Sequence, residues 1–198
     1  RRKEALDVLD FVNSFEQNGF FSMSTALNLQ GFCSYRADLI FYSNEQKIKP
    51  QEPNLSQEAI DIAFKKSYRI TSSIVEFGDK HIILLQPKNT NNFEIINHGY
   101  YKVSTVNRAF VEMLVNIQFF RDIETFINVF KPIKNKLSID KISEVLRHCN
   151  YIYPYSQSVG FILEKIGFHK NELLVFRKNQ PKYRFYIEKG KENYVFDD

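Results

Sequence analysis

The segment His98–Phe119 constrains the fold of this chain more than any other part of the sequence. Tyr100–Val103 predicts a short strand, and Ser104 is a good helix N-cap because its hydroxyl can accept a hydrogen bond from a free amide of the first turn. Beyond it, apolar residues recur at spacings of three and four: Val106, Ala109, Phe110, Met113, Leu114 and Ile117. This pattern predicts one wide apolar helical face. Such a helix must be buried over most of its surface.

Arg108 and Glu112 are two charged residues of this helix, and they lie four residues apart, so their side chains can pair. A pair on so apolar a helix is expected to be partly buried, and a buried charge needs its partner. Two interpretations follow. The main one is a structural ion pair or a clamp between helix and loop, and the alternative is a ligand-binding or catalytic pair.

Length and composition predict one globular domain. The chain has 198 residues, of which 43% are hydrophobic, so it can bury a proper core and is not a disordered sequence. Cys33 and Cys149 lie far apart without metal-ligand spacing, and we expect reduced thiols in a cytoplasmic protein. No stretch approaches the roughly 20 apolar residues of a membrane span, and no signal-peptide pattern is present. Because the chain starts at Arg1 rather than Met, we expect residues to have been removed before it.

The expected class is α+β, with a strand-rich first half forming an antiparallel sheet, a helical second half and a C-terminal β-hairpin. Helices are expected over residues 4–17, 22–30, 56–65, 123–129, 138–149 and 154–166, besides the one after Ser104. For the helix that ends at Cys149, either Ser138 or Asp140 is the expected start. Strands are expected over residues 38–43, 69–77, 80–86, 93–96, 100–103, 173–177 and 183–187. Gly78-Asp79 predicts a two-residue turn. We treat residues 1–198 as a single domain with a soft boundary near Asp122.

A search for catalytic chemistry gives one weak pattern. No glycine-rich phosphate loop or nucleophile elbow is present, and the four histidines are scattered, so we expect no enzyme, no cofactor and no metal. Asp79 precedes an apolar strand that ends at Gln86, two residues before Lys88. Metal-dependent nucleases use an acid, a second acid or amide and a lysine in this way. A nuclease-like domain of a phage-defence or restriction system is therefore the alternative hypothesis.

The C-terminal end is basic. Residues Lys165–Lys191 contain eight Lys or Arg and two acids, a local net charge of +6 in a chain of net charge +4. The expected hairpin interleaves aromatic residues with four cations: Arg177, Lys178, Lys182 and Arg184. These cations suit contacts with nucleic-acid phosphates. Simple strand alternation, with aromatic residues in the core and charges in water, is the competing interpretation.

Three segments together resemble the AbiEi-type antitoxin domain. Gly19–Phe32 (GFFSMSTALNLQGF) resembles its glycine–aromatic–small opening, which continues Ser-Ala-Leu…Gly-Leu. Val103–Glu112 (VSTVNRAFVE) resembles its Val-Ser-x-x-Glu-Arg-x-Leu-x-Asp stretch, and Val159–Gly167 (VGFILEKIG) its Leu-Gly-Tyr-Leu-Leu-Glu-x-x-Gly stretch. The similarity covers about residues 15–170. Ser24, Asn107 and Ser158 stand where that family commonly has other residues.

The resemblance implies a bacterial antitoxin of an abortive-infection, type IV toxin–antitoxin system. In that family an N-terminal winged helix binds operator DNA, and the following domain neutralises a nucleotidyltransferase toxin. No winged helix is evident before Gly19, so the resemblance assigns this chain to the antitoxin domain. The residues it carries over are Arg108, Glu112 and Glu164, with a structural role. A protein-interaction domain that uses exposed Phe and Tyr is a third hypothesis.

Overall fold

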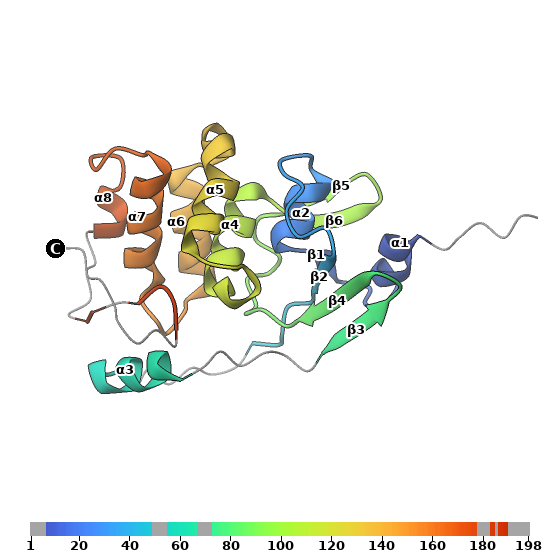
Figure 1. Cartoon of the computed structure of the whole chain (residues 1–198), viewed down its shortest axis with the longest axis horizontal. Helices are drawn as coiled ribbons and strands as arrows, with labels where there is room; N and C mark the ends of the chain where they lie inside the picture. The colour runs from blue at the N-terminus through green and yellow to red at the C-terminus, as the bar shows by residue number, and fades with distance from the viewer. Residues whose placement is uncertain (1–6, 49–54, 67–72, 178–182, 185, 190–198) are drawn as a thin grey trace, which may run out of the picture. The chain divides into compact units, whose positions relative to one another are not determined.

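The computed structural model describes residues 7–48, 55–66, 73–177, 183–184 and 186–189 of the chain, which fall into two compact units (Figure 1). Unit 1 comprises Arg1–Lys49 and Thr71–Glu112, and unit 2 comprises Pro50–Ile70 and Met113–Asp198. The later boundary falls between Glu112 and Met113, whereas the sequence suggests a soft boundary near Asp122 within a single domain.

Unit 1 is built on a six-stranded mixed sheet in the order β3-β4-β2-β1-β6-β5. Its strands are β1 (Phe20–Phe21), β2 (Leu39–Ser43), β3 (Ile74–Phe77), β4 (Lys80–Leu85), β5 (Ile95–His98) and β6 (Tyr101–Ser104). The pairs β2–β4 and β1–β6 are parallel, and the other neighbouring pairs are antiparallel.

The expected antiparallel sheet is therefore wrong, although the class is α+β. Tight turns make antiparallel neighbours, as at Gly78-Asp79, where the predicted two-residue connection between β3 and β4 is confirmed. The connection between β2 and β4 is long, however, so β4 can run in the same direction as β2. Long crossovers of this kind produce parallel neighbours. The predicted contrast between a strand-rich half and a helical half is also too simple, because helices are interleaved with these strands.

In the described part of unit 1, three helices contribute: α1 (Val8–Asn13), α2 (Met23–Leu29) and the first part of α4 (Val106–Val115). All five side chains of β2 are buried, so both faces of this central strand are covered. One face belongs to a hydrophobic cluster that also includes residues of α1 and α2: Val12, Phe21, Ala26, Ile40, Tyr42, Ile82 and Val103. By strand alternation, Phe20, Phe41, Ser43 and Ser104 belong to the opposite face.

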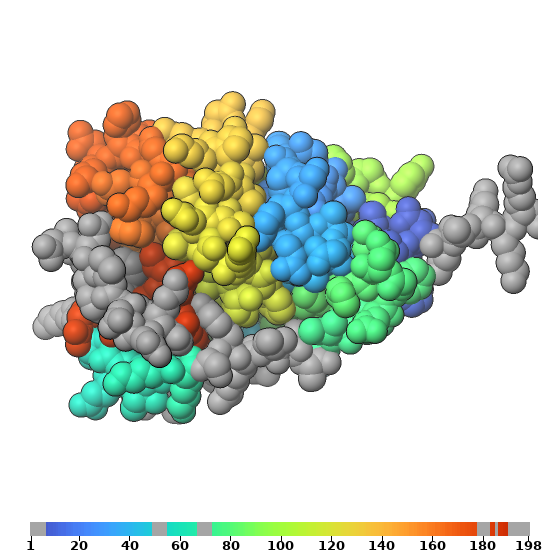
Figure 2. All heavy atoms as spheres, in the orientation of Figure 1, coloured from blue at the N-terminus to red at the C-terminus, as the bar shows by residue number. Residues whose placement is uncertain are grey.

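Unit 2 is helical. It contains α3 (Gln57–Lys65), α5 (Ile123–Phe130), α6 (Ile139–Cys149), α7 (Tyr155–Ile166), α8 (Leu174–Arg177) and the 3₁₀ turns η1 (Ile117–Phe119) and η2 (Lys131–Lys136). The predicted starts of α3 and α6 are confirmed, because Ser56 and Ser138 accept first-turn amide hydrogen bonds. Helix α7 packs against α5, α6 and α8, and Figure 2 shows α5 (yellow) and α7 (orange) at the surface of this unit.

The predicted C-terminal β-hairpin is wrong. Leu174–Arg177 forms the short helix α8 instead of a strand, and its turn region, residues 178–182, lies outside the described residues. The physical reason is packing: Leu173 and Phe176, three residues apart, are both buried, whereas Leu174 and Val175 between them are exposed. That spacing suits a helix on the surface of α7 and not a strand.

Within the part of the chain that the structure describes, no helix combines the length and the apolar character needed to cross a bilayer.

Candidate functional site

Unit 1 contains a buried charge cluster centred on Arg108, whose side chain is among the largest fully buried ones of the described residues. Arg108 is 1% exposed and Glu112 is 5% exposed. Their predicted pairing is present: Arg108 Nε donates to Glu112 Oε1 at 2.7 Å. The name buried charge cluster is used here for Arg108, Glu112, Glu45, Thr90 and Ser104.

The guanidinium of Arg108 connects α4 to two other segments of unit 1. Its Nη2 donates to Glu45 Oε1 at 2.9 Å. Its Nη1 donates to Thr90 Oγ1 at 2.8 Å and to the carbonyl oxygen of Phe93 at 2.6 Å. Glu45 follows β2, and Thr90 and Phe93 belong to the loop after β4. One side of the guanidinium also lies 4.9 Å from the centroid of the Phe20 ring. Arg108 thus fixes the helix to both loops.

Glu112 holds the other end of the cluster. Its Oε2 accepts a hydrogen bond from Ser104 Oγ at 2.7 Å and one from the backbone amide of Met23 at 3.4 Å. Ser104 therefore does not act as the predicted N-cap. Thr105 takes that position, because its Oγ1 accepts from the amide of Arg108 at 3.3 Å. The hydroxyl of Ser104 is used to bind a carboxylate instead.

Glu45 is held by the loop after β4. Its Oε2 accepts from the amides of Thr90 and Asn92 at 2.7 and 3.2 Å, and its Oε1 accepts from the Thr90 hydroxyl. Burial opposes the charge of Glu45, but these hydrogen bonds and Arg108 outweigh it, so its pKa lies below the usual value. Burial likewise opposes the charge of Arg108, but Glu112 and Glu45 together raise its pKa. Glu45 and Arg108 are therefore both charged at neutral pH.

The arrangement is suited to holding structure together. Each carboxylate oxygen of Glu45 and Glu112 has a hydrogen-bond donor, and the guanidinium has four acceptors. Buried charges satisfied in this way define one packing of the surrounding segments. The geometry is that of a clamp between α4, the end of β2 and the loop after β4, with the guanidinium turned away from solvent.

Sequence reasoning missed Glu45 and Thr90. The sequence predicts neither a helix nor a strand over residues 44–55, yet Glu45 has only 6% of its side chain exposed. The reason is that the parallel ladder continues past β2, since the amides of Asn44 and Gln46 donate to Leu85 and Pro87. Strand alternation from Phe41 through Ser43 then places Glu45 on the Arg108 side of the sheet. That alternation is the signal that could have found it.

The residues of the nuclease hypothesis do not form one site. Asp79 and Gln86 lie at opposite ends of β4, and a strand of this length separates them by roughly 20 Å. The Asp79 side chain is 86% exposed and pairs with Lys80. Among the described residues, no group of three or more His, Cys, Asp or Glu side chains is arranged to hold a metal ion.

The basic residues are only partly described. Lys178 and Lys182 lie outside the described residues, whereas Arg177 and Arg184 are both surface side chains with acidic neighbours. Arg177 pairs with Glu164 at 3.4 Å, and Arg184 pairs with Asp61 at 3.8 Å. Glu164, carried over by the resemblance, also pairs with Lys170 at 3.3 Å. It therefore bridges α7 to the segment that contains α8.

A scan against protein-family models finds no family that matches this chain, and a search of curated proteins finds no matching relative.

Proposed function

We propose that this chain is a non-enzymatic antitoxin and regulator domain of a bacterial abortive-infection system, which opposes a nucleotidyltransferase toxin in the cytoplasm. The proposal rests on the resemblance of three segments to the AbiEi-type antitoxin domain. Its operator DNA contact is assigned to the basic end of the chain, through Arg177, Lys178, Lys182 and Arg184.

One observation supports the proposal beyond the wording of the motifs. Ser104, Arg108 and Glu112 stand at the motif positions of the second resembling segment, and they are joined in a single buried network. The same Glu112 accepts a hydrogen bond from Met23 in the first resembling segment. The residues that carry the similarity therefore act on one another, as expected when a motif maintains a scaffold.

The third resembling segment gives a weaker line of support. Val159–Gly167 forms most of α7, and Gly167 ends the helix in the left-handed conformation with φ of 113°. Gly160 lies where an added Cβ would stand 3.2 Å from Phe176 Cβ, so the motif glycine allows α8 to pack closely. A packing role of this kind is consistent with a non-catalytic domain.

A growth-rescue experiment tests the proposal. The nucleotidyltransferase gene encoded beside this chain is induced in bacteria, with and without the chain expressed from a second plasmid. We expect colony formation to be restored by the wild-type chain and by the surface variant Lys170→Ala. The variant Arg108→Met, which breaks the buried charge cluster, is expected to rescue poorly.

Two results would overturn the proposal. One is the lack of any nucleotidyltransferase gene beside that of this chain. The other is continued toxicity when an immunoblot shows that the wild-type chain is present at the level of the toxin.

A further inference from the structure

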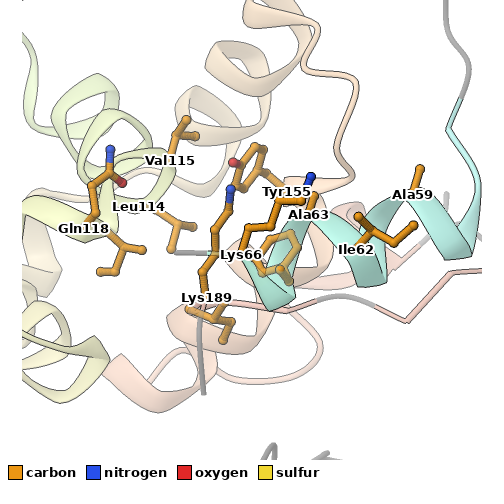
Figure 3. Close-up of a pocket in the computed structure, with 12 residues that line it drawn as sticks. Ala59, Ile62, Ala63, Lys66, Leu114, Val115, Gln118, Tyr155 and Lys189 are labelled. Carbon is orange, nitrogen blue, oxygen red and sulfur yellow. The ribbon is translucent and has the colours of Figure 1, made fainter. Parts of the chain in front are cut away.

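Unit 2 contains a pocket of about 630 Å³ that no part of the proposed function uses. It lies between α3, the end of α4 with η1, and residues Ile187 and Lys189 (Figure 3). A volume of this size is within the range of small-molecule sites, which are mostly apolar with a few placed polar groups.

Two apolar walls form the pocket. Ala59, Ile62 and Ala63 lie on one side, and Leu114 and Val115 on the other, as Figure 3 shows. Ile62 is 56% exposed on α3 (turquoise in Figure 2), so it offers apolar surface along this wall of the pocket. A slot between two such walls fits an alkyl chain.

The polar groups of the pocket are mainly cationic or hydrogen-bond donors. Lys66 and Lys189 line it together with the hydroxyl of Tyr155, and none of the described lining residues is acidic. In Figure 3 the Lys189 side chain extends in the direction of the Tyr155 hydroxyl. Lys189 Nζ also lies 5.4 Å from the centroid of the Phe64 ring. The charge of the pocket is thus complementary to an anion.

Two acidic side chains, Asp61 and Glu188, belong to the segments that line the pocket, and both accept hydrogen bonds. Asp61 of α3 accepts hydrogen bonds from Gln57 at 2.6 Å and from the Tyr186 hydroxyl at 2.9 Å, besides its pairing with Arg184. Glu188 accepts from the amide of Ile123 at 3.1 Å. Neither carboxylate belongs to the residues that line the pocket, whereas Lys66 and Lys189 both do.

The wall that contains Ile187 and Lys189 is fixed to α3. Tyr183 donates to the carbonyl oxygen of Leu55 at 2.9 Å, and the amide of Arg184 donates to Gln57 Oε1 at 2.8 Å. The Tyr186 and Phe64 rings stack with centroids 5.2 Å apart. These contacts form the pocket before any ligand arrives, which lowers the entropy cost of binding.

We propose that this pocket binds a single-chain amphipathic organic anion, with its alkyl chain between α3 and Leu114–Val115 and its carboxylate or phosphate head facing Lys66 and Lys189. The proposal goes beyond the antitoxin function and does not depend on it.

Isothermal titration with four ten-carbon probes tests the proposal: decanoate, monodecyl phosphate, decanol and decyltrimethylammonium, each below its micelle concentration. We expect saturable binding of one or both anions at one site per chain, and the tighter anion identifies the head group. Decanol should bind about tenfold more weakly, because it lacks the contribution of two partly exposed ion pairs. The cation should not bind.

Matched variants locate the site. Lys66→Met with Lys189→Met should weaken anion binding about tenfold, whereas Lys141→Met with Lys170→Met, an equal change of charge elsewhere in unit 2, should leave it unchanged. Ile62→Asp, at an exposed position, should abolish binding while the far-UV circular dichroism spectrum stays the same. Equal binding of anion and cation, or unchanged binding in the Lys66 and Lys189 variant, would overturn the proposal.

Discussion

At the scale of single residues, Arg108 joins α4 to two other segments of unit 1. A lone arginine in a protein interior is costly, because its charge loses hydration that only close acceptors can replace. Here Glu112, Glu45, Thr90 and Phe93 provide those acceptors from three separate segments. The cluster therefore contributes mainly by making any other packing of these segments unfavourable.

Replacing Arg108 by methionine is predicted to destabilise the protein strongly. The change leaves two buried carboxylates without their cation, and losses of about 3–5 kcal/mol are typical of such cases. Urea unfolding followed by circular dichroism measures it. Arg36→Met is the matched control, because Arg36 pairs with Asp38 at the surface and should cost less than about 1 kcal/mol.

A triple variant tests whether Arg108→Met destabilises the protein because the two carboxylates lose their cation or because the side chain becomes smaller. Arg108→Met combined with Glu45→Gln and Glu112→Gln removes all three charges and should recover part of the stability. Equal stability of Arg108→Met and wild type would contradict the clamp.

Acid is predicted to weaken unit 1 through Glu45. Its pKa is lower in the folded protein than the ordinary value of 4.5, so the unfolded state takes up the proton first as pH falls. The stabilisation is complete above pH 4.5 and is lost as pH decreases through the lower, folded value. Urea midpoints measured at a series of pH values should fall more steeply for the wild type than for Glu45→Gln. Parallel curves would show that Glu45 has the same pKa in both states.

At the scale of elements, local signals placed most helices, and packing decided the exceptions. Helices α3, α6 and α7 begin and end near the residues expected from Ser56, Ser138, Pro154 and Gly167. Their caps and apolar periodicity depend on residues close together in the chain. Helix α8 was expected to be a strand, because four residues carry too short a pattern to distinguish the two periods.

Gly19 illustrates how a residue has a role that its neighbours in sequence do not reveal. The first helix was expected to reach residue 17, just before Gly19, but α1 already ends at Asn13. In the structure a Cβ at Gly19 would clash with the ring of Tyr42. The ring is buried, and its hydroxyl donates to the carbonyl oxygen of Glu16 at 3.1 Å. The site therefore leaves no room for a methyl group.

Gly19→Ala is accordingly predicted to destabilise the protein by about 1–3 kcal/mol, the usual cost of overpacking a core. Chemical denaturation measures the loss. In a double-mutant cycle with Tyr42→Leu, the effect of Gly19→Ala should become smaller, because the smaller side chain removes the clash. Additive effects of the two changes would show that the tyrosine ring is not the cause.

At the scale of the whole molecule, the basic end does not form the hairpin expected from alternation. Arg177 ends α8, and Arg184 belongs to the segment beside α3. Both arginines pair with carboxylates at the surface. They stay exposed, but a phosphate would have to replace these carboxylates in order to bind. Any DNA contact has to compete with Glu164 and Asp61.

The DNA prediction nevertheless remains testable by its salt dependence. A variant with four substitutions, Arg177→Ala, Lys178→Ala, Lys182→Ala and Arg184→Ala, should bind operator-length duplex DNA more weakly. The slope of the logarithm of the binding constant against the logarithm of the salt concentration should also become shallower, by about 0.9 for each phosphate contact that is lost. The control replaces four other surface cations: Arg36→Ala, Lys131→Ala, Lys136→Ala and Lys141→Ala. Gel shifts that are the same for wild type and the first variant would remove the basic end from the proposal.

The features that the sequence predicts correctly depend on near neighbours in the chain. The Gly78-Asp79 turn, the starts of α3 and α6, and the pairing of Arg108 with Glu112 all involve residues a few positions apart. The parallel pairing of β2 with β4, and the contacts of Glu45 and Thr90 with Arg108, arise only when the chain folds. Those contacts join residues 18 to 63 positions apart. They are set by how the sheet orders its strands, which local propensity does not encode.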